Sequence, residues 1–151
     1  MKRIRRILLA SDFSPASRPA FKKAIEIARS ERARLFIVHV MVPLVPPLMG
    51  EGVFVAATTW NAMQRQARQA AQGQIDKLIQ EAKKAGVAVQ GLVVEGVPAD
   101  QIVRLARLRR ADMLVIGTHG RTGFSRLFLG SVAARVVATA RCPVLTVRSP
   151  R

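Results

Sequence analysis

Short apolar runs alternate with amphipathic helical patterns along this whole chain, and this alternation limits the possible folds more than any other feature. Each run has the length of a strand, and apolar residues at helical spacing fill the stretches between the runs. The runs are Ile4 to Ala10, Leu35 to Met41, Val87 to Val94, Met113 to Ile116 and Val144 to Val147. Strands that alternate with helices predict a parallel sheet with helices on both faces.

The predicted helices begin and end at recognisable residues. Ser14 is placed at the N-cap of the first helix, and Pro15 at its first helical position. A long helix is expected from about Thr58 to Ala85, where Gly86 ends it. The buried stripe expected on the long helix is Met63, Ala67, Ala70, Ala71, Leu78, Ile79 and Ala82.

Two further helices and one irregular segment complete the pattern. Pro98 opens the third helix, and the last helix is expected from Ser131 to Ala140. Prolines stop the second strand, and the stretch from Pro43 to about Ala57 is typical of a mobile segment.

The chain is expected to form one domain over residues 1–151, because its sequence contains no internal repeat and no linker. Right-handed crossovers between parallel strands leave few strand orders. Ligands in such sheets bind at the carboxyl ends of strands, where the strand order reverses. The first strand ends at Ser11 and Asp12, and the fourth ends at Gly117 and Thr118. We therefore predict an open, Rossmann-like α/β sheet of five parallel strands in the order 3-2-1-4-5.

The charge balance is unusual, with 25 Lys and Arg against 9 Asp and Glu and a formal net charge of +16. Such an excess suggests anionic partners, such as nucleic acid, a membrane surface or nucleotides. The cations are scattered along the sequence, with short clusters only at Lys2–Arg6 and Arg104–Arg110. Aromatic residues are few and Tyr is absent, so a platform for stacking bases is not expected. On this basis we do not expect a nucleic-acid partner.

The single cysteine, Cys142, bears on the cellular compartment. One cysteine cannot form an internal disulfide, and Cys142 is interpreted as a small packed residue. No apolar run approaches the roughly 18 residues that a membrane span needs. A reducing cytoplasm is therefore the expected location.

A glycine-rich connection joins the fourth strand to the last helix. Gly117, Gly120, Gly130 and Ser131 give it the spacing Gly-x2-Gly-x9-Gly-Ser. The N–H groups at a helix start have no intrahelical partner, and the helix dipole is positive there, so a phosphate can bind. The connection is longer than the usual βα loop of about 2–6 residues, and long ordered connections often bind ligands. The spacing matches neither a P-loop nor a dinucleotide fingerprint.

With this connection, and with the segments Ile7 to Pro15, Ile37 to Val40 and Arg141 to Val147, the chain resembles the universal stress proteins of the ATP-binding type. The resemblance covers nearly the whole length and implies the same strand order. It implies that Asp12 contacts the nucleotide, that the backbone of Val40 meets the adenine base, and that the glycine loop holds ribose and phosphates. The binding residues it implies are Ala10, Ser11, Asp12, Val40, Ile116, Gly117, His119, Gly120, Arg121, Gly130, Ser131 and Val132.

The residues themselves leave alternatives open. Asp12 could accept hydrogen bonds from a ribose or bind a Mg²⁺ or Mn²⁺ ion held by the phosphates, or it could accept from backbone N–H groups at the helix start. Gly117 and Gly120 could instead serve a tight turn that needs positive φ. Gly130 and Ser131 could form an ordinary helix cap.

The side chains of His119 and Arg121 lie within the same connection. Each could contact a phosphate, or His119 could pack and Arg121 could be solvated. His39 lies among apolar residues within a strand, so we interpret it as a hydrogen-bonded core or edge histidine rather than a ligand.

The leading functional hypothesis is an ATP-binding stress-response and signalling module, with Mg²⁺ or Mn²⁺ accompanying the nucleotide. No catalytic residue is assigned, because the chain has neither a Walker lysine nor a recognisable activator of water, and fast hydrolysis is not expected. Two alternatives are a slow nucleotide hydrolase and a basic module that binds nucleic acid or an anionic surface.

The final strand, Val144 to Val147, is expected at an edge of the sheet, where unpaired backbone groups favour pairing with another chain. The resembling family pairs this strand across a two-fold axis, which implies a homodimer. The alternative is a monomer whose edge is covered by the chain's own segment from Val42 to Ala57.

Overall fold

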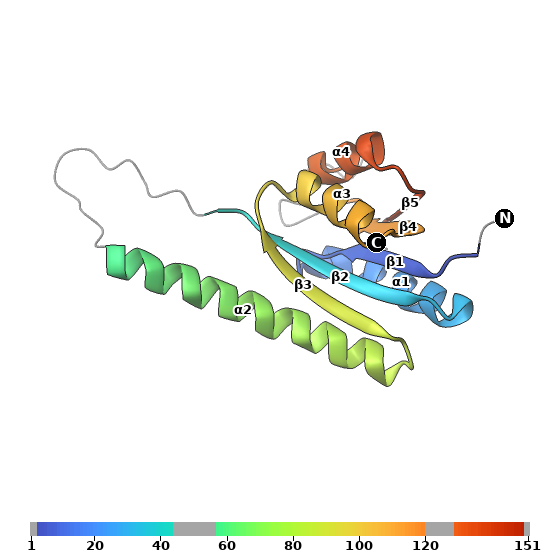
Figure 1. The fold of residues 1–151 in the computed structure, drawn as a ribbon, viewed down its shortest axis with the longest axis horizontal. Coiled ribbons are helices and arrows are strands. Elements are labelled where there is room, and N and C mark those ends of the chain that lie inside the picture. The colour runs from blue at the N-terminus through green and yellow to red at the C-terminus, as the bar shows by residue number, and fades with distance from the viewer. Residues whose placement is uncertain (1–2, 44–56, 120–128, 150–151) are drawn as a thin grey trace.

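The computed structural model describes residues 3–43, 57–119 and 129–149. Five parallel strands form one sheet in the order β3-β2-β1-β4-β5, which confirms the prediction (Figure 1). The strands are β1 (Arg6–Ala10), β2 (Arg34–Met41), β3 (Val89–Glu95), β4 (Met113–Gly117) and β5 (Val144–Val147). The stretch predicted to be mobile lies mostly outside the described residues.

Helices cover both faces of the sheet. The helices α1 (Arg18–Glu31) and α2 (Ala57–Lys84) pack on one face, and α3 (Pro98–Leu108) and α4 (Ser131–Thr139) pack on the other (Figure 1). Successive side chains of a strand point to opposite faces, so each strand contributes to both cores. Accordingly Ile7 and Leu9 join the first core, whereas Leu8 joins the second. None of the helices in the described ranges is long and apolar enough to cross a membrane.

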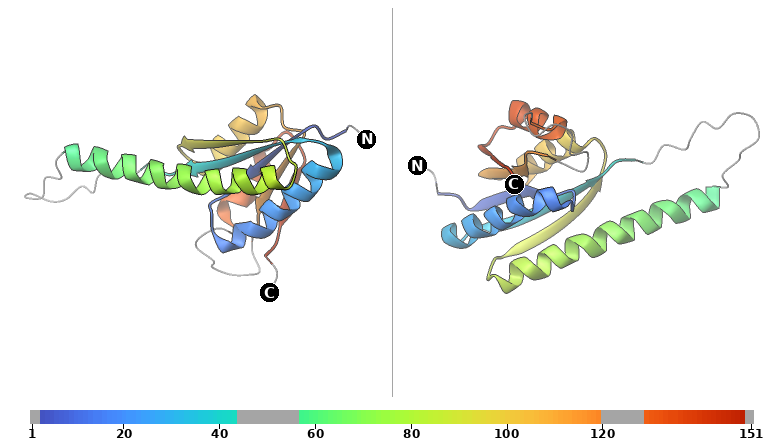
Figure 2. Two further views of the ribbon diagram at one scale, coloured as in Figure 1. Left: turned by 90° about the horizontal axis from the view of Figure 1, so that it is seen from below. Right: turned by 180° about the vertical axis from the view of Figure 1, so that it is seen from behind.

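The buried stripe of α2 differs from the predicted one. Its buried residues are Ala71, Ile75, Leu78 and Ala82. The prediction omitted Ile75 and included Met63 and Ala70, both of which are exposed. Figure 2 shows the reason: the first turns of α2 extend past the end of the sheet. Helical spacing alone cannot indicate where the supporting surface ends.

The start of the first helix also differs from the prediction. A 3-10 turn, η1 (Pro15–Ser17), precedes α1, and the α-helix begins only at Arg18. The side chain of Ser14 makes no cap hydrogen bond, because its hydroxyl donates to the carboxylate of Asp12 instead. Gly86 ends α2 as predicted, with a positive φ of 79°.

Candidate functional site

Two candidate segments meet at the carboxyl edge of the sheet, which we define as the edge where the parallel strands end. β1 and β4 are direct neighbours, with Ala10 opposite Ile116 in the register. The loop that follows β1 therefore lies beside the connection that follows β4. This confirms that Asp12 and Gly117 are brought to the same place, at the point where the strand order reverses.

The loop after β1 is a hydrogen-bonded turn built on two side chains. Oδ1 of Asp12 accepts from the backbone N–H of Ser14 at 3.0 Å and from its hydroxyl at 2.6 Å. The hydroxyl of Ser11, which is buried, accepts from the backbone N–H of Phe13 at 3.2 Å. Asp12 therefore accepts from a backbone N–H at the helix start, the alternative left open by the sequence. No hydrogen bond to Oδ2 occurs within the part of the chain that the structure describes.

Phe13 holds this turn in an unusual backbone conformation. Its φ is 64°, in the left-handed region that bulky residues seldom adopt. Its ring stacks on that of His39, with ring centroids 4.2 Å apart and an interplanar angle of 26°. Nδ1 of His39 lies 2.9 Å from the backbone oxygen of Ser11, which can only accept, so Nδ1 carries the proton. The prediction that His39 is a buried, hydrogen-bonded histidine is confirmed.

The connection after β4 is closed at its base by one backbone hydrogen bond. The N–H of Gly130 donates to the carbonyl oxygen of Thr118 at 2.8 Å. A Cβ atom at position 130 would lie 3.1 Å from that same oxygen, so only glycine permits this approach without displacement. Gly130 is also the N-cap of α4, and the N–H groups of Ser131 and Val132 open the helix without intrahelical partners.

Gly117 plays a different part from the one suggested by a tight turn. Its φ is not positive, so that interpretation is wrong for this glycine. A Cβ at position 117 would lie 3.5 Å from the backbone oxygens of Ala16 and His119, which is ordinary contact distance. Gly117 thus ends β4 close to η1, next to the turn of Asp12. Gly120 and Arg121 lie outside the described residues.

His119 is half-buried at the start of the connection. Its Nδ1 lies 2.9 Å from the hydroxyl of Thr118, whose side chain is buried. The N–H of Thr118 donates to the carbonyl oxygen of Val147 at 3.0 Å, which anchors this end of the connection to β5. Three short contacts therefore fix both ends of the glycine-rich connection.

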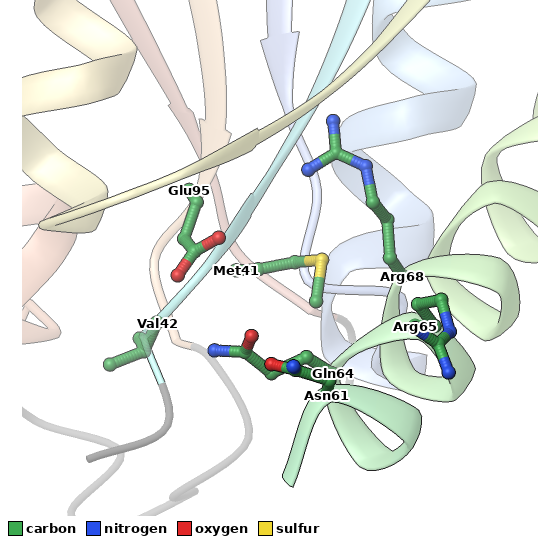
Figure 3. Close-up of a pocket in the computed structure, with 7 residues that line it drawn as sticks. All are labelled: Met41, Val42, Asn61, Gln64, Arg65, Arg68 and Glu95. Atoms are coloured by element: carbon green, nitrogen blue, oxygen red, sulfur yellow. The ribbon is translucent and has the colours of Figure 1, made fainter. Parts of the chain in front are cut away.

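A groove of about 280 Å³ lies beside this edge, between the first half of α2 and the ends of β2 and β3 (Figure 3). It is lined by Met41, Val42, Asn61, Gln64, Arg65, Arg68 and Glu95. This groove was not predicted from the sequence, although one of its lining residues, Met41, directly follows Val40, the residue expected to meet the adenine base. The available signal was the stripe of α2: continued backward from Ala71 in helical steps, it reaches Arg68, Gln64 and Asn61 and becomes polar.

The described part of this edge offers no cluster of side chains that could hold a metal ion by itself. No group of three or more His, Cys, Asp or Glu side chains within residues 3–43, 57–119 and 129–149 could hold a metal ion. A metal bound at Asp12 would need most of its ligands from elsewhere, and phosphate oxygens are suitable ligands for Mg²⁺ or Mn²⁺.

Comparisons with known proteins agree with this fold. The model of the universal stress protein family matches residues 3–148. Universal stress protein MJ0531 of Methanocaldococcus jannaschii is 36% identical over 147 residues, which is 97% of this chain and 84% of the relative.

Solved structures give the same result. That of MJ0577 from the same organism superimposes with a TM-score of 0.81 at 22% identity, covering 99% of both chains. A universal stress protein solved in complex with cAMP superimposes with a TM-score of 0.73 at 25% identity, covering 97% of this chain and 98% of the other. The chain belongs to the universal stress protein family.

Proposed function

We propose that this chain is an ATP-binding module of stress response and signalling, and that the nucleotide binds at the carboxyl edge of the sheet. The observation that carries the proposal is the start of α4. Gly130 closes the connection against Thr118 and caps α4, and the N–H groups of the first turn of α4 have no intrahelical partners. A helix start of this kind is complementary to phosphates. The relative solved with cAMP supports an adenine nucleotide as the ligand class.

The proposal assigns parts to the remaining candidate residues. Backbone N–H groups of Gly130, Ser131 and Val132 would hold phosphates, with Gly120, Arg121 and His119 adding contacts from the connection. Gly117 and Ile116 would lie by the ribose, while Ala10, Ser11 and the backbone of Val40 would face the base. Oδ2 of Asp12, the oxygen outside its turn, would accept from the ribose or bind a Mg²⁺ or Mn²⁺ ion carried by the phosphates.

Turnover should be slow. A phosphate-binding lysine of the Walker type is absent from the sequence, and the sequence offers no recognisable activator of water. The module would act by stabilising one conformation or one partner surface when ATP is bound. We place it in the cytoplasm, on the argument from its single cysteine.

Calorimetric titration with ATP and Mg²⁺ tests this function. Wild type should bind with micromolar affinity, whereas Gly130→Val should lose binding because its Cβ would push the connection away from Thr118. Gly73→Val is the matched control, since a Cβ at Gly73 meets nothing within 4 Å. Equal affinity of a folded Gly130→Val variant and wild type would contradict the site, and absence of binding by wild type would contradict the function.

We also propose that β5 pairs with its counterpart in a second copy to give a homodimer. Leu114 N donates to Pro143 O and Thr118 N donates to Val147 O, so the odd-numbered residues of β5 face β4. The backbone groups of Thr146 therefore face outward, on the open side of the edge strand. An unpaired strand edge of this kind favours association.

Light scattering at tens of micromolar tests the dimer. Thr146→Pro removes an outward N–H without touching the ladder to β4, so it should yield folded monomers. Leu145→Pro is the control, because it would break the ladder itself and should lower stability. A wild type that is monomeric with and without ATP would contradict the dimer.

A further inference from the structure

The fold gathers cations that are scattered in the sequence. In a parallel sheet all strands begin at one edge, and the helices that precede them end there. This amino edge lies opposite the proposed nucleotide site, on the right-hand side in Figure 1 for β1 to β3. Exposed arginines or lysines precede each strand, including Arg5 before β1, Arg32 before β2, Lys84 before β3 and Arg141 before β5.

Two further arginines, Arg34 and Arg109, lie against the buried ring of Phe36, and Arg6 is the neighbour of Arg34 in the sheet. Arg6 and Arg34 are direct partners in the register of β1 and β2, so two like charges stand on adjacent strands. The guanidinium carbons of Arg34 and Arg109 lie 6.0 and 5.5 Å from the centroid of Phe36. Like charges opposite each other destabilise a sheet, and attraction to the ring and to the nearby carboxylate of Asp112, which accepts from the backbone N–H groups of Arg5 and Arg6, acts against this repulsion.

Two further arginines occupy positions that favour glycine. The helices α1, α2 and α3 end in the same way. A residue with left-handed backbone conformation ends each helix, and the N–H of the next residue donates to the carbonyl oxygen five residues earlier. Ala33 donates to Ala28 in this way, and Ala111 donates to Ala106. At the end of α2 the left-handed residue is Gly86. In α1 and α3 it is Arg32, with φ 53°, and Arg110, with φ 51°. Arginine is strained in this conformation, whereas glycine is not.

Favourable interaction with helix dipoles explains only part of this arrangement. Cations in the last turn of a helix, such as Arg29, Lys83 and Arg107, stabilise its carboxyl end. The dipole also favours a cation at Arg32 and Arg110, but it does not remove the strain of their positive φ, and it does not apply to Arg6 and Arg34, which lie in strands. Local rules that are broken repeatedly at one place are typical of a functional surface.

We propose that the amino edge binds the phosphate backbone of double-stranded nucleic acid. Arginine binds phosphate oxygens in a bidentate manner, and such contacts read no sequence. A single strand would need exposed aromatic rings for stacking, but Phe36 is buried beneath two guanidinium groups. A membrane surface would need a set of exposed apolar side chains, and among the described last turns of the helices that end at this edge only Leu108 and Val137 are exposed large apolar residues.

Fluorescence anisotropy with a labelled 20-base-pair DNA duplex of mixed sequence tests the proposal. The logarithm of affinity should fall linearly with the logarithm of salt concentration, by about 0.9 per neutralised phosphate. Replacing Arg6, Arg34 and Arg109 by Gln should flatten this slope by about 2 to 3 and weaken binding at least about 10-fold near 100 mM salt. The matched control replaces Arg65, Arg68 and Lys77 of α2 by Gln, which removes the same charge elsewhere.

The outcomes separate clearly. Selective weakening by the triple variant supports the proposal, whereas equal weakening by the control would show that only net charge matters and would overturn it. Binding to vesicles that contain phosphatidylserine without binding to the duplex would also overturn it. If the triple variant fails to fold, Arg32→Gly with Arg110→Gly removes charge while relieving strain, and this folded variant should still bind the duplex more weakly than wild type.

Discussion

The two edges of this sheet present opposite kinds of binding group. At the carboxyl edge the available groups belong to the backbone, namely the N–H groups that open α4 and the turn of Asp12. At the amino edge they are side chains, namely arginines carried by the residues between helices and strands. Parallel topology causes this division, because every helix starts at one edge and ends at the other. Under the two proposals above, one sheet carries two anion-binding surfaces with different chemistry.

The largest expected effect separates the two edges outright. Gly130→Val should lower ATP affinity by about 100-fold, or about 2.8 kcal/mol, while duplex binding stays unchanged. The triple replacement of Arg6, Arg34 and Arg109 by Gln should weaken duplex binding while ATP affinity stays unchanged. Calorimetry for ATP and anisotropy for the duplex, performed on all three proteins, measure both effects. Loss of both activities in one folded variant would break the comparison.

A second prediction concerns the carboxylate that stabilises the amino edge. Oδ2 of Asp112 accepts from the backbone N–H groups of Arg5 at 2.9 Å and Arg6 at 3.0 Å, which ties the start of β1 to the residue before β4. Asp112→Ala removes both hydrogen bonds and a negative charge among cations, so the free energy of unfolding should fall by about 1–3 kcal/mol. Urea denaturation measures it. Asp112→Asn keeps one acceptor oxygen, so its free energy of unfolding should fall by less than that of Asp112→Ala. An equal loss in the two variants would contradict the role of these hydrogen bonds.

The strained arginines give a smaller effect of opposite sign. Arg32→Gly and Arg110→Gly should each raise the free energy of unfolding by about 0.5–1 kcal/mol, because glycine adopts positive φ without steric conflict. Thermal unfolding measures the gain. Arg29→Gly, inside α1, is the control and should instead destabilise by roughly 1 kcal/mol. If Arg32→Gly and Arg110→Gly also lower the free energy of unfolding, the two arginines stabilise the helix ends, and glycine is not the preferred residue there as it is at Gly86.

The smallest predicted effect concerns the thiol of Cys142 and whether the cations of the amino edge alter its ionisation. Cys142 lies between α4 and β5, where burial is the main cause that raises the pKa of its thiol, with the charge of Asp112 acting in the same direction. A raised pKa leaves less thiolate at pH 8, so native Cys142 should react with a disulfide reagent more slowly than the urea-unfolded chain. The same shift makes the unfolding free energy decline as the pH rises above about 9. Faster reaction in the native state would mean that the cations outweigh burial.

Much of the fold follows from the sequence because it depends on local patterns. The apolar runs predict every strand, the alternation with helices predicts a parallel sheet, and the two candidate segments after the first and fourth strands, together with the family resemblance, predict the sheet order. Local pattern could not show where α2 loses its supporting strands, so Met63 was wrongly placed in the core. It also could not reveal the competition at Ser14, whose hydroxyl bonds Asp12 instead of capping the helix.

The candidate site was predictable to a similar extent. The meeting of the two loops follows from strand order, whereas the left-handed Phe13 and its stack on His39 depend on contacts between distant segments. Charge was the least predictable property. Cations such as Arg6, Arg34 and Arg109 are far apart in the sequence and become neighbours only when the sheet forms.

The overhanging half of α2 gives this helix two different local stabilities. Residues from Ala71 onward are held by the core, so their amides should exchange with solvent only on global unfolding. The preceding turns have little to support them beyond their own hydrogen bonds, and helices that lack tertiary packing are marginal in water. These turns should therefore open and close independently of the domain. Because they form one wall of the groove that contains Gln64 and Arg68, any ligand bound there would also shift the helix–coil equilibrium of that wall towards the helix.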